Sequence, residues 1–152
     1  MLDFALAHAL HVLSVILWIG GVGFVTLVLI PALGRTDEAT RMARFHELEG
    51  RFAPQARVWV AVAGASGLWM VWRGDMWSRF ADPQFWWMHA MVAAWLPFAL
   101  MLYVLEPLVL HRRMRDSTDP AGDFRRLRLM HQVLLGLSLV AAFGAAAGAH
   151  GF

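Results

Sequence analysis

The feature that most restricts this chain is a run near its start that carries no charged residue. Positions 4–33 contain only apolar and uncharged side chains. A helix needs about 20 consecutive apolar residues to cross a hydrocarbon layer of roughly 30 Å. With 59% hydrophobic and only 16% charged residues, the chain has too much apolar surface for a water-soluble domain of its length. We therefore expect a first transmembrane helix over 4–33.

Three more apolar segments follow, over about 52–72, 85–110 and 129–152. Only the second is marginal, because Gln55 and Arg57 interrupt it and the arginine needs an anion or a place near the helix end. The sequence therefore predicts an all-α fold, an integral membrane bundle of four transmembrane helices that forms a single domain over 1–152. Cysteine is absent, which excludes disulfides and thiolate metal sites.

The basic residues predict how the bundle is oriented. All 13 are arginines, and eleven of them lie in the connections 34–57 and 111–128, whereas 73–84 carries two and the termini none. Cytoplasmic loops of membrane proteins carry the excess of positive charge. We therefore expect both termini to face outward from a bacterial inner (cytoplasmic) membrane, with the lipid bilayer as partner. The same rule accounts for the arginine clusters without nucleic acid, which we exclude as a partner.

Small residues recur at helical spacing in the last segment, where Gly144 and Gly148 enclose three alanines. Such a face lets another helix approach closely. The partner helix can belong to the same chain or to a second copy in a homodimer, and the sequence leaves both open.

Two histidines lie at similar depth in the outer halves of the first and third predicted helices, His11 and His89. Neutral imidazoles are the usual axial ligands of haem b in membranes, and such cofactors lie in the cores of helix bundles. An iron bond would also offset the loss of water around a histidine in the membrane. We therefore predict a haem b at His11 and His89, used for one-electron redox chemistry or electron transfer across the membrane.

Further residues extend this prediction. Two fallback ligands, a tryptophan on the helix face of His11 and an arginine for a haem propionate complete the site: His8, His150, Trp18 and Arg57. Electrons would be exchanged with a quinone or an unidentified redox partner. A second haem near the arginine-rich side, at His46 and His131, is a further option.

Two other interpretations remain open. A histidine in a membrane helix can hydrogen-bond a neighbouring helix instead, in which case the chain is a structural subunit without a cofactor. Alternatively, soft thioether and imidazole ligands on the outer side would suit Cu(I). This copper site would use Met88, His89, Met91 and Met70.

Several short motifs resemble those of the CopD and HemJ-like families of membrane proteins. His11 precedes Trp18 by seven positions, and Gly20 and Gly21 follow, as in the first helix of these families. The other similar motifs are Phe45-His-Glu-Leu-Glu49 before the second helix, Trp86-Trp87-Met88-His89-Ala90 in the third, and Arg112-Arg113 with Phe124-Arg125-Arg126 before the fourth. The resemblance covers nearly the whole chain.

What the resemblance implies divides in two. HemJ-like proteins are haem-b-binding protoporphyrinogen oxidases, and CopD-like proteins are assigned to copper uptake or resistance. The HemJ-like motif continues with a lysine after the alanine of the third helix, and here Met91 takes that place. The resemblance therefore implies a haem b protein or, alternatively, a copper transport or binding protein. Protoporphyrinogen oxidase-like activity is a second alternative.

Overall fold

The structure is a computed structural model that describes residues 2–110 and 119–148. In these residues the chain is helical throughout, apart from short turns, and contains no strand. The elements are α1 (Leu2–Phe24), η1 (Val25–Leu29), α2 (Ile30–Gly34), α3 (Glu38–Arg73), η2 (Trp77–Ala81), η3 (Pro83–Phe85), α4 (Trp86–Leu100), η4 (Met101–Leu110) and α6 (Pro120–Gly148). The all-α prediction is therefore confirmed for the described part of the chain.

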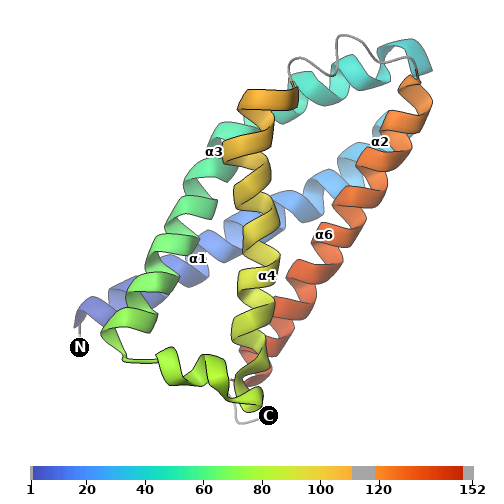
Figure 1. Cartoon of the computed structure of the whole chain (residues 1–152). Coiled ribbons are helices and arrows are strands. Elements are labelled where there is room, and N and C mark those ends of the chain that lie inside the picture. Colours follow the sequence, from blue (N-terminus) through green and yellow to red (C-terminus); the bar gives the residue numbers. More distant parts are fainter. Residues whose placement is uncertain (1, 111–118, 149–152) are drawn as a thin grey trace.

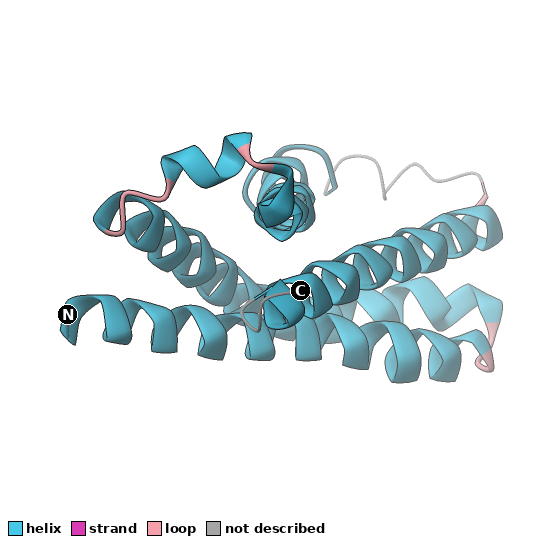
Figure 2. Ribbon diagram, turned by 90° about the horizontal axis from the view of Figure 1, so that it is seen from below, coloured by secondary structure: helices cyan, strands magenta, loops and turns pink. Residues whose placement is uncertain are grey.

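The long helices form two closely packed pairs, α1 with α3 and α4 with α6. The start of α1, the η2–η3 segment and the end of α6 lie toward one end of the molecule, and the α2–α3 turn lies toward the other (Figure 1). An ion pair of 3.0 Å between Arg73 Nε and Asp3 Oδ2 joins α3 to α1 at the first end. The helices cross at an angle and are not parallel (Figure 2).

Three helices of the described residues are long and apolar enough to cross a membrane: Leu2–Gly34, Pro83–Leu105 and Pro120–Gly148. These correspond to the first, third and fourth predicted spans. The second predicted span lies in α3, which is 36 residues long and thus about 54 Å measured along its bent axis. Gln55 and Arg57 lower the apolar character of its second half. The chain is therefore a helical protein with the composition of a multi-pass membrane protein.

Prolines interrupt the long helices and change their course. Pro54 lies inside α3, and the teal first part of that helix runs at a steep angle to its green second part (Figure 1). Pro31 follows the wide helical turns of η1, and η4 contains Pro107 within its own wide turns. A proline has no amide hydrogen to continue the helical ladder, so bends and wide turns are expected at such positions.

The buried core consists of two clusters. One lies midway along the bundle, where the rings of Trp18 and Phe98 meet edge to face with centroids 4.9 Å apart, beside the fully buried Val60. The other lies near the α2–α3 turn around the fully buried Phe45. Many large apolar side chains point outward from the helices instead, as expected where lipid is the surrounding solvent.

Aromatic side chains rest against glycines at the helix contacts. In five places a Cβ atom added to the glycine would lie within 3.2 Å of a ring atom from another helix: Phe52 on Gly21, Trp95 on Gly64, His11 on Gly67, Trp86 on Gly144 and Trp87 on Gly148. The small residues predicted in the last helix thus receive two tryptophans of α4. The contact that the structure shows at this face is within the chain.

Neighbouring glycines of α1 allow a direct test of these contacts. A Cβ on Gly21 would lie 2.1 Å from Cζ of Phe52, whereas a Cβ on Gly20 meets nothing within 4 Å. We expect Gly21→Ala to lower the free energy of unfolding by about 1–3 kcal/mol through overpacking. Gly20→Ala should leave it unchanged or raise it slightly, because alanine favours helix. Denaturant titration in detergent measures both, and equal effects of the two variants would contradict this packing.

Candidate functional site

His11 is fixed between α1 and α3. Its Nδ1 atom lies 2.9 Å from the carbonyl oxygen of Ala63 and 3.3 Å from Oγ of Ser66. A carbonyl oxygen only accepts, so Nδ1 carries the hydrogen and Nε2 keeps its lone pair. Gly67 permits the approach, since a Cβ there would lie 3.2 Å from Cε1 of the imidazole. The ring is thus oriented as metal-binding histidines are, with the second nitrogen held by a backbone carbonyl.

The other outer histidines have different surroundings. His8 and His89 are exposed on the surface of the bundle. The ring of His89 meets that of Phe80 edge to face, with centroids 5.4 Å apart. His11 and His89 therefore have separate partners, in α3 and in η2 respectively. His150, the second fallback ligand, lies outside the described residues.

Arg57 is held by the backbone of the neighbouring helix. Its Nε atom donates to the carbonyl oxygen of Leu102 at 3.2 Å, and the hydroxyl of Tyr103 donates to the carbonyl oxygen of Arg57. In the wide turns of η4 each amide bonds to the carbonyl five residues earlier. Pro107 has no amide hydrogen, so the carbonyl of Leu102 lacks its usual donor. Arg57 supplies that donor, and its Nε atom is therefore committed within the bundle.

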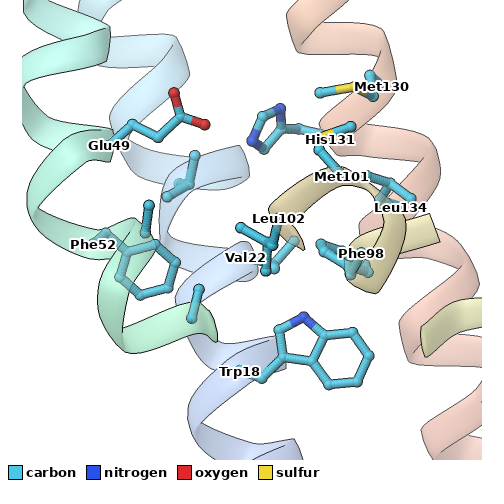
Figure 3. A pocket seen from close by; sticks show the side chains of 13 residues that line it. Trp18, Val22, Glu49, Phe52, Phe98, Met101, Leu102, Met130, His131 and Leu134 are labelled. Carbon is cyan, nitrogen blue, oxygen red and sulfur yellow. The ribbon is translucent and has the colours of Figure 1, made fainter. Parts of the chain in front are cut away.

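A cavity of about 60 Å³ lies in the half of the bundle nearer the arginine-rich connections. Its lining comes from α1, η1, α3, α4, η4 and α6, and is mostly apolar or aromatic, with Phe52, Phe98 and Leu134 among its walls. Two polar side chains face it from opposite sides: the imidazole of His131 from α6 and the carboxylate of Glu49 from α3 (Figure 3).

The histidines near this cavity are both engaged on one nitrogen. His131 Nδ1 donates to the carbonyl oxygen of Leu127 at 3.0 Å, and His46 Nδ1 lies 3.5 Å from Oε2 of Glu49. The buried ring of Phe45 packs edge to face on both imidazoles, with centroids 5.6 Å from His46 and 5.9 Å from His131. The pair predicted for a second haem thus lies in one cluster, with an aromatic ring against both members.

Trp18 lies at the other end of the same cavity. Its side chain is only 4% exposed, and its indole nitrogen is directed toward the cavity (Figure 3). Among the described residues, Trp18 Nε1 and His46 Nε2 are the buried side-chain nitrogens without a hydrogen-bond partner. Buried donors are almost always satisfied, so this N–H marks the cavity as a polar site.

The residues of the predicted copper site are spread over different surroundings. Met88 and Met70 are buried, Met91 is half-buried and His89 is exposed. The adjacent residues Met88 and His89 of α4 therefore point in different directions, one into the bundle and one out of it. Residues 2–110 and 119–148 contain no group of three or more histidine, aspartate, glutamate or cysteine side chains that could hold a metal ion.

Glu49 is the charged residue of the cavity wall, and it is not among the site residues predicted from the sequence. The pattern that identifies it is the spacing of the buried residues of α3: Ala53, Ala56 and Val60 recur every three or four positions, and Phe45 lies two such steps before Ala53. Glu49 falls in phase with this series, four residues after Phe45. A carboxylate in register with a buried helix face is the signal of a polar site in the interior.

No protein-family model matches the sequence, and neither a curated protein nor a solved structure matches the chain. The fold and the site therefore define the class: an all-helical chain with apolar helices that can cross a membrane, and polar groups enclosed between them.

The role of Arg57 can be tested without changing its charge. Arg57→Lys removes the Nε–H that satisfies Leu102, and an ammonium does not reproduce the guanidinium geometry. We expect the free energy of unfolding to fall by about 1–2 kcal/mol, because the half-buried carbonyl of Leu102 loses its donor.

The matched control is Arg51→Lys on the same helix. Arg51 pairs with Glu47 at 3.1 Å in an exposed position, so the change should stay within about 0.5 kcal/mol. Denaturant titration of both variants in the same detergent measures the difference. A similar loss at both positions would contradict the assignment.

Proposed function

We propose that the chain crosses a bacterial cytoplasmic membrane four times, with both termini outward. Support comes from the length of α3, from its close packing along α1, and from the way Arg57 is satisfied by the backbone of η4. Seven arginines of the described part lie at or near the α2–α3 turn and the start of α6: Arg35, Arg41, Arg44, Arg51, Arg125, Arg126 and Arg128. This end is the cytoplasmic one under the positive-inside rule.

Single cysteines test this topology, because the natural chain has none. Ser78 in η2 and Ala39 at the start of α3 are both exposed. We expect Ser78→Cys to react with a membrane-impermeant maleimide added to spheroplasts, and Ala39→Cys to react only after the membrane is broken. The unmodified chain is the background control. Labelling of both positions from the outside would show that α3 does not cross.

We propose further that the protein binds haem b and serves one-electron transfer. The observation that carries this proposal is the orientation of His11, whose Nδ1 donates to Ala63 and whose Nε2 is left for a ligand. The motif resemblance to HemJ-like proteins supports the same cofactor. In this proposal His11 and His89 hold the iron, and the bound haem supplies a reversible one-electron couple. His8 is the fallback ligand among the described residues.

Other residues of the chain have defined tasks in this proposal. Ala63 and Ser66 hold the imidazole of His11 in one orientation. The inner cavity, at about 60 Å³, is far smaller than the roughly 300 Å³ at which cofactor pockets begin. In this proposal the haem lies in the outer half, at His11 and His89. Trp86 and Trp87 already occupy Gly144 and Gly148, which gives no support to a homodimer through that face.

Absorption spectra of protein purified from haem-supplied cells test the cofactor. We expect a Soret band and a sharp α-band after reduction with dithionite, and iron in elemental analysis. His11→Ala and His89→Ala should each lose most of the haem, whereas His8→Ala, one turn from His11 and exposed, should keep it.

The alternatives give different results in the same measurements. Copper in place of iron would favour a copper protein based on Met88, His89, Met91 and Met70. A protein that contains neither iron nor copper would favour the interpretation as a structural subunit. Haem that survives both His11→Ala and His89→Ala would refute the ligands proposed here.

A further inference from the structure

The inner cavity contains a polar group that the proposed haem does not account for. It contains an indole N–H with no partner, in a side chain that is 4% exposed and directed into the space. Trp95 provides a contrast, because its Nε1 donates to the carbonyl oxygen of Val60 at 2.8 Å. The two tryptophans pack in the same core cluster. One has a protein partner for its N–H and the other does not.

The polar groups around the cavity define which hydrogen bonds a bound molecule must make. Trp18 Nε1 can only donate, so the bound molecule must carry an acceptor. His131 donates through Nδ1 to Leu127, which leaves Nε2 as an acceptor, and the Glu49 carboxylate accepts as well. A bound molecule that accepts a hydrogen bond from Trp18 and donates one to His131 or Glu49 satisfies the polar groups of the cavity. A simple anion is disfavoured by Glu49, and a cation by the N–H of Trp18.

The size of the cavity narrows the choice. A water molecule occupies about 30 Å³ of liquid, and a polar cavity holds one when it offers two to four polar partners. The volume of about 60 Å³ has room for water molecules and is smaller than the roughly 150 Å³ of a cavity that binds benzene. A quinone ring is larger than this space, whereas water satisfies both the volume and the hydrogen-bond pattern.

We propose that this cavity is a binding site for water molecules that link Trp18 to His131 and Glu49. The site lies in the half of the bundle nearer the arginine-rich connections, and the unpartnered Nε2 of His46 lies behind Glu49. Water there extends a polar path from that end of the bundle to the depth of Trp18. The path is independent of the haem proposed at His11, which lies in the other half.

Exchange of the indole hydrogens with deuterium tests the proposal. Protein labelled with ¹⁵N-tryptophan shows one indole signal for each of its eight tryptophans, and Trp18→Phe and Trp95→Phe assign the two of interest. We expect the Trp18 N–H to exchange faster than the Trp95 N–H by roughly tenfold or more, because water reaches the first without opening of the structure. Equal protection of the two signals would overturn the proposal, since a dry cavity protects both.

A cavity-filling variant keeps the test decisive if Trp18→Phe does not fold. Ala56 lines the cavity and is buried, so Ala56→Val adds methyl groups where the water molecules are proposed. The Trp18 signal should then become as protected as that of Trp95, whose own signal should not change. Ala53→Val repeats the experiment from a second wall of the cavity. Unchanged exchange at Trp18 in both variants would refute the water site, whether or not haem is bound.

Discussion

Close contact between an aromatic ring and a glycine of the neighbouring helix is the interaction on which this bundle depends. Lipid is as apolar as leucine, so helices in a membrane gain little from burying apolar side chains and associate through close packing and hydrogen bonds. The glycines of α1, α3 and α6 provide both. Gly64 admits Trp95 and Gly67 admits His11, and each ring donates to a carbonyl of α3. The close packing on glycine therefore brings the rings of Trp95 and His11 within hydrogen-bonding distance of α3, and these hydrogen bonds fix the orientation of both rings.

Backbone carbonyls satisfy most of the polar side chains inside the bundle. A carbonyl oxygen has two lone pairs, so one in a helix can accept a side-chain donor besides its helical amide, as Ala63 does for His11. Proline adds a second source, because it leaves a carbonyl without its donor, as at Leu102, which receives Arg57. An arginine in an apolar segment is then a structural element. Within residues 2–110 and 119–148, the buried side-chain nitrogens that lack a partner belong to Trp18, which lines the inner cavity, and to His46, which lies beside Glu49 of the cavity wall.

How much of this could be predicted depends on the kind of signal. The helical class and the first span follow from a charge-free run, since a bilayer leaves the backbone few alternatives. The bend of α3 and the contacts of individual glycines depend on which helices become neighbours, and one sequence does not reveal that. The helix face of His89 illustrates the limit. Spacing placed it at the depth of His11, yet His89 is exposed beside Phe80 while the adjacent Met88 is buried, because only packing decides which side of α4 faces the bundle.

The two halves of the molecule hold histidines in chemically different ways. In the outer half the Nδ1 of His11 donates to the carbonyl oxygen of Ala63, so its remaining nitrogen has one fixed direction, as in histidines that bind metals. In the inner half His131 and Glu49 face a small space together with a donor that has no partner, an arrangement that only a molecule able both to donate and to accept can complete. Histidine therefore has different hydrogen-bonding surroundings in the outer and the inner half of the bundle. What separates them is the middle cluster of Trp18, Phe98 and Val60, which isolates one environment from the other.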